Sequence, residues 1–226
     1  MTTQPTHTPR FQAQGHRQAL PPGAPGYLWV LVGILAAIEA VLALSDAGII
    51  LPAGLRWSAL ALGAFWQPIW SGQIAPIYPG QTFVMFLSHA FLHGGLAHLA
   101  LNSVVLLALG KLATARIGMI RTLAVLGLAA AGGGLVFALL SSGNAPMIGA
   151  SGAVFGLLGL WQAWDYQMRR RLGLPLNPVL MTCLALVAAN VAFFVMLGGG
   201  LAWEAHLGGW IAGWIAGHGF ARGNRP

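Results

Sequence analysis

Six apolar stretches, each long enough to cross a bilayer as a helix, constrain this chain more than any other feature. About 20 apolar residues span the hydrocarbon layer of a membrane, which is roughly 30 Å thick. Hydrophobic residues make up 57% of the chain and charged residues only 7%, unlike a soluble domain of this size. The stretches lie near Leu28 to Leu44, Phe83 to Gly110, Met119 to Leu140, Gly149 to Gln167, Pro178 to Leu197 and Trp203 to Phe220.

These stretches predict an all-α polytopic membrane protein, because a spanning helix closes its backbone hydrogen bonds within its own segment. We expect one six-helix membrane domain over residues 27–221. Residues 1–26 hold prolines among Gln, Thr and His and no apolar run, which predicts a flexible cytoplasmic tail rather than a signal peptide. Residues 222–226 form a second, short tail.

Basic residues are distributed unevenly between the two predicted sides of the membrane. Of the 11 Lys and Arg residues, all but Arg56 fall on the side that holds both termini. Since positively charged loops tend to stay in the cytoplasm, we expect both termini there. An anionic inner leaflet accounts for the net charge of +7, so no nucleic-acid partner is predicted.

The loop over 45–82 is rich in aromatic residues, which favours short helices at the outer interface over an ordinary extracellular loop.

Three polar clusters lie inside or at the ends of the apolar stretches, where polar groups are costly and usually functional. Together they contribute a hydroxyl, imidazoles and an amide, the groups a serine hydrolase uses as nucleophile, base and oxyanion donors. The pattern predicts a protease that works inside the membrane. The clusters are His98 to Asn102, Gly149 to Gly152 and Ala205 to Gly209.

Ser151 is the candidate nucleophile. It opens a predicted helix, whose first N–H groups are unpaired and can hold a developing oxyanion. Gly149 and Gly152 on either side would let a substrate backbone come close. Taken alone, the tetrapeptide favours helix packing over a nucleophile, since small residues line most packed membrane helices.

His206 is the candidate base. Gly209 and Gly213 share its helix face, which predicts close packing on Gly152 and its neighbours. Ser151 and His206 would then come within about 3 Å, a hydrogen-bonding distance. A histidine that only bridges two helices is the alternative.

A histidine-rich segment precedes Asn102. His98 and Asn102 are four residues apart on one helix face, and both could donate to an oxyanion. His89 and His93 are also four residues apart, so a zinc site is the alternative; the missing glutamate and the interrupting glycine pair disfavour it. The lone Cys183 allows no internal disulfide, and no cofactor or metal is predicted.

Over residues 28 to 220 the chain resembles the rhomboid intramembrane serine proteases of the six-helix bacterial type. The resemblance implies a dyad of Ser151 and His206 and an oxyanion hole made by His98, Asn102 and the Ser151 N–H. It implies structural support from His93, with Gly149, Gly152, Gly209 and Gly213. It also implies a bacterial plasma-membrane location and cleavage of single-span membrane proteins near the outer face.

The chain departs from the pattern of many relatives in the first loop, where a Trp-Arg pair is replaced by the segment Phe83 to Phe86. This puts the stability of that loop in doubt.

No acidic residue suits a third triad position, and Glu39 is expected to have a partner in the bundle interior. An inactive protein of the same fold that binds membrane helices is the main alternative function; a small transporter is disfavoured because the two halves show no repeat. The sequence indicates neither the physiological substrate nor the oligomeric state.

Overall fold

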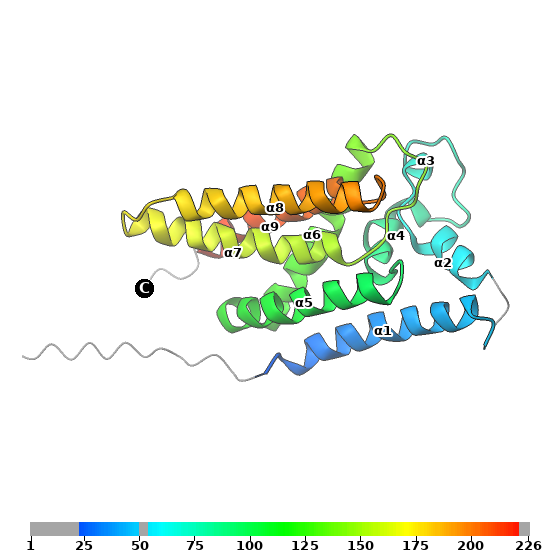
Figure 1. The fold of residues 1–226 in the computed structure, drawn as a ribbon, viewed down its shortest axis with the longest axis horizontal. Helices are drawn as coiled ribbons and strands as arrows, with labels where there is room; N and C mark the ends of the chain where they lie inside the picture. The colour runs from blue at the N-terminus through cyan, green and yellow to red at the C-terminus, as the bar shows by residue number, and fades with distance from the viewer. Residues whose placement is uncertain (1–22, 50–53, 222–226) are drawn as a thin grey trace, which may run out of the picture.

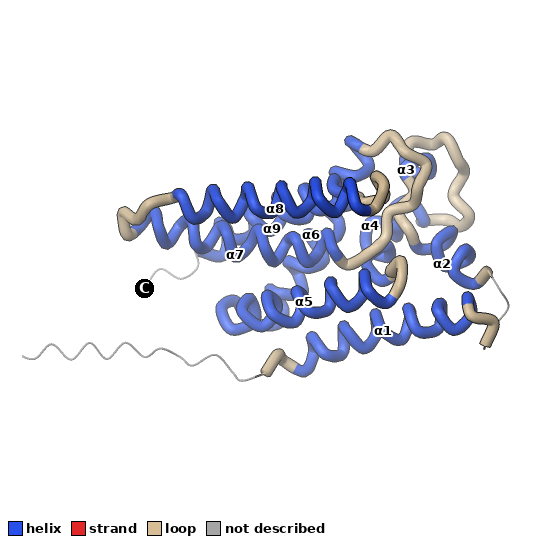
Figure 2. The backbone as a smooth tube through the Cα atoms, viewed as in Figure 1, coloured by secondary structure: helices blue, strands red, loops and turns tan. Residues whose placement is uncertain are grey.

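The computed structural model describes residues 23–49 and 54–221, and in this part of the chain the regular structure is helical (Figures 1 and 2). A single antiparallel bridge between Phe65 and Met147 is the exception. The predicted tails over 1–26 and 222–226 lie outside the described residues, except for 23–26. The helices are α1 (Gly26–Asp46), α2 (Leu55–Gly63), α3 (Gln67–Trp70), α4 (Gln81–Ser88), η1 (His89–Phe91), α5 (Leu96–Ile117), α6 (Met119–Leu140), α7 (Ser151–Arg171), α8 (Asn177–Met196) and α9 (Trp203–Ala221).

Six of these helices are 19 to 22 residues long, which confirms the all-α membrane bundle. Four of them, α1, α5, α6 and α8, are both long and apolar enough to cross a membrane by length and composition. The other two, α7 and α9, match the predicted stretches in position, but α7 ends in Asp165 and three arginines and α9 contains Glu204, two histidines and five glycines. Ten residues of α7 are buried, so this helix meets other helices over much of its surface.

The second predicted stretch, Phe83 to Gly110, is not one helix, and this prediction was wrong. The structure ends α4 at Ser88, continues with the short 3-10 turn η1, and begins α5 only at Leu96. Gly95 has a φ of +120°, a conformation that residues with a side chain rarely adopt, so the chain cannot continue as a helix there. The interruption places His93 in a loop rather than on a helix.

The helices are arranged so that α1 begins and α9 ends at the same end of the bundle, on the left in Figure 1. The first turns of α5, α7 and α9 lie at the opposite end, next to α2, α3 and α4 (Figure 1). This end therefore gathers the polar clusters that the sequence places at the beginnings of these helices.

The segment between α1 and α4 contains the short helices α2 and α3, as the sequence predicted. The fully buried ring of Phe65 anchors it and packs edge-to-face on Phe86, at 4.9 Å between ring centroids. Ser88 Oγ donates to the carbonyl of Gly63 at 2.7 Å, and Gln81 Nε2 to that of Ala61 at 2.7 Å. Phe86, which contacts Phe65, belongs to the segment that replaces the expected Trp-Arg pair.

Helix α8 packs less closely than the other long helices. Of its 20 residues only Val179 is buried, and large apolar side chains such as Leu184 and Val195 are exposed. Since an exposed apolar face is what a lipid environment favours, α8 is the helix with the largest share of its surface available to lipid.

Candidate active site

Ser151 is the first residue of α7, and a turn at Gly149 leads into it. Gly149 has a φ of +115°; its N–H donates to the carbonyl of His89 at 2.9 Å. The N–H of Ala150 donates to His93 Nε2 at 3.4 Å. The next N–H groups belong to the first turn of α7, and the first N–H groups of a helix have no carbonyl acceptor within that helix. The hydroxyl and the N–H of Ser151 therefore lie together at a helix N-terminus that favours negative charge.

The ring of His98 lies directly against this turn. A β-carbon added at Gly149 would lie 2.7 Å from His98 Cε1 and 2.8 Å from its Nε2, and 3.8 Å from Ser151 Oγ. Only glycine leaves room for the ring at this distance. The structure thus places His98 and Ser151 on either side of Gly149.

Asn102 is buried one turn further along α5. Its Nδ2 donates to the carbonyl of His98 in the same helix, at 3.1 Å. No hydrogen bond joins this amide to the turn at residues 149–151. In the structure the Asn102 amide is therefore hydrogen-bonded within α5 and not to Ser151.

His93 is fully buried and joins three parts of the site. Its Nε2 accepts from Ala150, its ring lies 5.1 Å from that of His98 between centroids, and its carbonyl accepts from Arg56 at 2.9 Å. It positions the residues around Ser151. Within residues 23–49 and 54–221, no three His, Cys, Asp or Glu side chains converge in the way a metal site requires.

Helices α7 and α9 touch through their backbones. A β-carbon at Gly209 would lie 1.9 Å from the carbonyl oxygen of Gly152, and one at Gly213 would lie 1.8 Å from that of Gly156. Such distances are far below van der Waals contact, so these positions admit no side chain. The glycine face expected from the sequence is therefore the contact surface between the helix that carries Ser151 and the helix that carries His206.

His206 lies at this contact, 8% exposed, but makes no hydrogen bond to Ser151 among the described residues. The separation of about 3 Å expected from the sequence is not realised as a hydrogen bond. The imidazole instead stacks on Phe155, with ring centroids 4.1 Å apart and planes 7° apart. Its Nδ1 lies 2.6 Å from Asn190 Oδ1 on α8.

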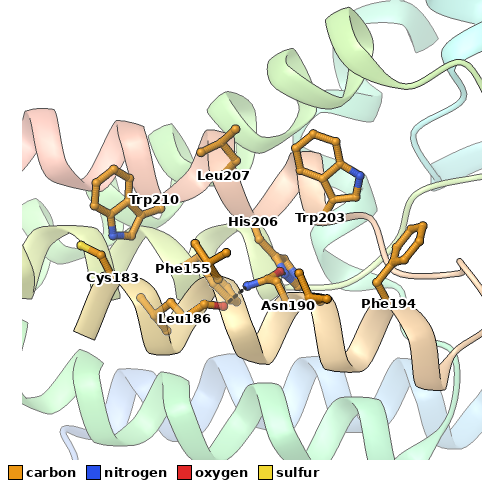
Figure 3. A pocket seen from close by; sticks show the side chains of 11 residues that line it. Phe155, Cys183, Leu186, Asn190, Phe194, Trp203, His206, Leu207 and Trp210 are labelled. Atoms are coloured by element: carbon orange, nitrogen blue, oxygen red, sulfur yellow. Dashed lines mark hydrogen bonds between the residues drawn. The ribbon is translucent and has the colours of Figure 1, made fainter. Parts of the chain in front are cut away.

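Sequence reasoning missed two neighbours of His206, namely Phe155 and Asn190. Phe155 is four residues after Ser151, on the same face of α7, and this spacing could have indicated it. Asn190 is an amide inside an apolar stretch, the same signal that drew attention to His206. Figure 3 shows His206 and Asn190 facing each other from α9 and α8, in the wall of a largely apolar pocket of about 520 Å³.

The partner expected for Glu39 is Arg56, at the start of α2. The two form a bidentate ion pair, with N–O distances of 2.9 and 3.2 Å. Arg56 also pairs with Asp46 at 2.5 Å. The hydrogen bond that Arg56 donates to Glu39 is the main reason why the pKa of Arg56 is raised above its ordinary value. Through the carbonyl of His93, this cluster is connected to the turn that carries Ser151.

Comparison with known proteins gives consistent matches. Residues 80–223 match the family model of the rhomboid domain. RHOMBOID-like protein 4 of Arabidopsis thaliana is 32% identical over 149 residues, which make up 64% of this chain and 36% of that protein. RHOMBOID-like protein 5 of the same plant is 31% identical over 142 residues, 58% of this chain and 42% of that protein. The matched region thus spans well under half the length of either relative.

Proposed function

This chain belongs to the rhomboid family, and from that membership we propose that it is an intramembrane serine endopeptidase. The observation that carries the proposal is the turn at Gly149, which sets Ser151 Oγ and the His98 ring side by side at the N-terminus of α7. The backbone contact of α7 with α9 supports it, because His206 lies at that contact. A nucleophile, a base and oxyanion donors then share one end of the bundle.

Peptide cleavage would begin with attack of Ser151 Oγ on the scissile carbonyl while His206 takes the hydroxyl proton. The two side chains have to come within hydrogen-bonding reach before this step, since they are not hydrogen-bonded in the structure. The Ser151 N–H and the His98 ring would donate to the oxyanion, with Asn102 as a further donor once its amide is released from the His98 carbonyl. His206 would next protonate the leaving amine, and water would hydrolyse the acyl-enzyme.

The substrates that suit such a site are single membrane-spanning proteins. Ser151 lies at the end of the bundle opposite to the basic last turn of α7, which contains Arg169, Arg170 and Arg171. Because basic segments stay in the cytoplasm, we place the site towards the outer face and both termini inside, in a bacterial plasma membrane. The scissile bond would have to leave its helix, since a helical peptide bond is shielded by its own turns.

An inactive protein that binds membrane helices is the second candidate. The missing hydrogen bond between Ser151 and His206 favours it, since a resting dyad is often joined in this way. The fold, the family and the glycine contact fit both candidates equally well. The two differ in a single measurable property, which is peptide-bond cleavage that depends on Ser151.

The purified chain in liposomes, mixed with a tagged single-span membrane protein, provides the test. We expect cleavage, and a fall of at least about 1,000-fold on Ser151→Ala and on His206→Ala. Ser142→Ala and His218→Ala change the same residue types away from the site and should cleave normally. EDTA should have no effect. Cleavage that survives Ser151→Ala would rule out this nucleophile, and no cleavage by any form across several substrates would favour the binding protein.

A further inference from the structure

Asn190 is the one polar contact of the His206 imidazole in the described structure. His206 Nδ1 and Asn190 Oδ1 lie 2.6 Å apart, a short hydrogen bond. The Nδ2 of the same amide donates to the carbonyl of Leu186 at 2.8 Å, within α8. Since a carbonyl can only accept, the amide nitrogen must point to Leu186 and the amide oxygen to His206. The orientation of the amide is therefore fixed by its own helix.

This orientation determines which ring nitrogen of His206 carries the proton. An amide oxygen only accepts, so Nδ1 must donate to it and is the protonated nitrogen. In the neutral ring Nε2 is then left with its lone pair. Nε2 is thus the ring nitrogen able to take a proton from a nucleophile. The opposite tautomer would place two lone pairs against each other at 2.6 Å.

The surroundings of this contact supply no competing partner. The pocket that contains it is lined, apart from His206 and Asn190, by aliphatic and aromatic side chains and by Cys183. Phe155 covers one face of the imidazole at 4.1 Å. An unpaired imidazole N–H in such a setting is costly, and that cost is avoided only while Asn190 accepts from it. Figure 3 shows the two side chains meeting in the pocket wall, His206 from α9 and Asn190 from α8.

We propose that Asn190 is a positioning residue that holds His206 in the Nδ1-protonated tautomer, so that α8 contributes the third member of the catalytic group. The inference rests on the proposed protease function. It departs from a simple dyad, because the role that a carboxylate plays in a serine-protease triad falls here to a neutral amide. A carboxylate is not needed, since an amide oxygen also orients the ring.

The test compares cleavage by wild type, Asn190→Leu, Asn190→Asp and Val187→Ala in liposomes, with kcat and KM determined separately. Leucine removes the acceptor at similar volume, and we expect kcat to fall about 10- to 100-fold with little change in KM. Aspartate restores an acceptor oxygen and should recover most of that loss. Val187→Ala trims the same pocket on the same helix without touching the hydrogen bond, and should retain wild-type kcat.

A spectroscopic readout separates this role from a merely structural one. In protein labelled with ¹⁵N-histidine, the His206 signal, assigned by its loss in His206→Gln, should show the Nδ1-protonated tautomer. Asn190→Leu should shift that signal towards the Nε2-protonated form, whereas Val187→Ala should not.

The proposal and the function on which it rests fail in different ways. If wild type and Asn190→Leu cleave at equal kcat while Ser151→Ala is inactive, the protease function stands and the role of Asn190 is overturned. An unchanged tautomer in Asn190→Leu overturns it as well, even if that variant is too unstable for kinetics. If no form cleaves, the protease function and this inference fall together.

Discussion

Arg56 and Glu39 form a bidentate ion pair that joins the first long helix, α1, to α2, in the segment before the candidate site. Glu39 is 1% exposed, whereas the Arg56 side chain is 22% exposed and also donates to the carbonyl of His93. The carboxylate therefore depends on Arg56 for compensation of its charge. A buried charge without its partner is far more costly than an exposed one.

From this relationship we expect Arg56→Ala to lower the free energy of unfolding by about 3 kcal/mol, because it leaves Glu39 buried and unpaired. Asp46→Asn removes the other, 43% exposed partner of Arg56 and should cost less than about 1 kcal/mol. Thermal unfolding in detergent measures both. In the double variant Arg56→Ala with Glu39→Leu, part of the loss should return. Equal losses for Arg56→Ala and Asp46→Asn would contradict this account.

The second prediction concerns the glycines of α9. In Gly213→Ala the new methyl group would overlap the carbonyl oxygen of Gly156, which belongs to a helix and cannot rotate away. We expect a loss of about 3 kcal/mol, near the upper end of the range for overpacking, together with loss of cleavage. Gly219→Ala, on the same helix with nothing within 4 Å, should be neutral or slightly stabilising. If both variants melt together with wild type, the helices do not meet as described.

The third prediction concerns Gly149, where a side chain would have two effects: strain of the backbone and displacement of the His98 ring. Gly149→Ala introduces a side chain at φ +115° and pushes the His98 ring away from Ser151, so cleavage should be lost. Gly118→Ala introduces a side chain at φ +80° with nothing within 4 Å. Both variants should lose about 1–2 kcal/mol of stability from strain. Only Gly149→Ala should also lose activity per folded molecule, and comparable activity in the two would argue against the role of the His98 contact.

A fourth prediction concerns orientation in the membrane. Residues 141–146, between α6 and α7, and residues 172–176, between α7 and α8, lie at opposite ends of α7. In a Cys183→Ala background, Ser142→Cys should react with an impermeant maleimide added to intact cells. Leu174→Cys, next to the basic end of α7, should react only after the membrane is opened. The reverse pattern would invert the proposed topology and place Ser151 on the cytoplasmic side.

The sequence predicted the helical bundle and drew attention to the residues of the candidate site, because both signals are local. Long apolar runs indicate helices, and Ser151 and His206 were conspicuous as polar groups beside such runs. The interruption before α5 was missed because apolar residues continue on both sides of Gly94 and Gly95 and conceal it. The backbone there is determined by the positive φ of Gly95, which hydropathy does not reveal.

The contacts that the sequence could not supply join residues on different helices. Glu39 was expected to have a partner, but its identity depends on how α2 folds back against α1. Asn190 was overlooked because its partner, His206, is on the next helix, and only the packing of α8 against α9 brings them together. The hydrogen bond expected between Ser151 and His206 is absent for a similar reason, since the His206 ring contacts Phe155 and Asn190 instead and no residue pattern records those contacts.

Helices α7 and α9 contact each other through backbone atoms, and this contact fixes the position of one helix relative to the other beside the candidate site. Side chains at an ordinary helix contact exchange between rotamers, and each exchange lets the helices shift. Glycine has no rotamers, so the contact of Gly152 with Gly209 has no such freedom. The spacing of α7 and α9 at this contact is then set by backbone atoms alone, and no side-chain rotation between the two helices changes it.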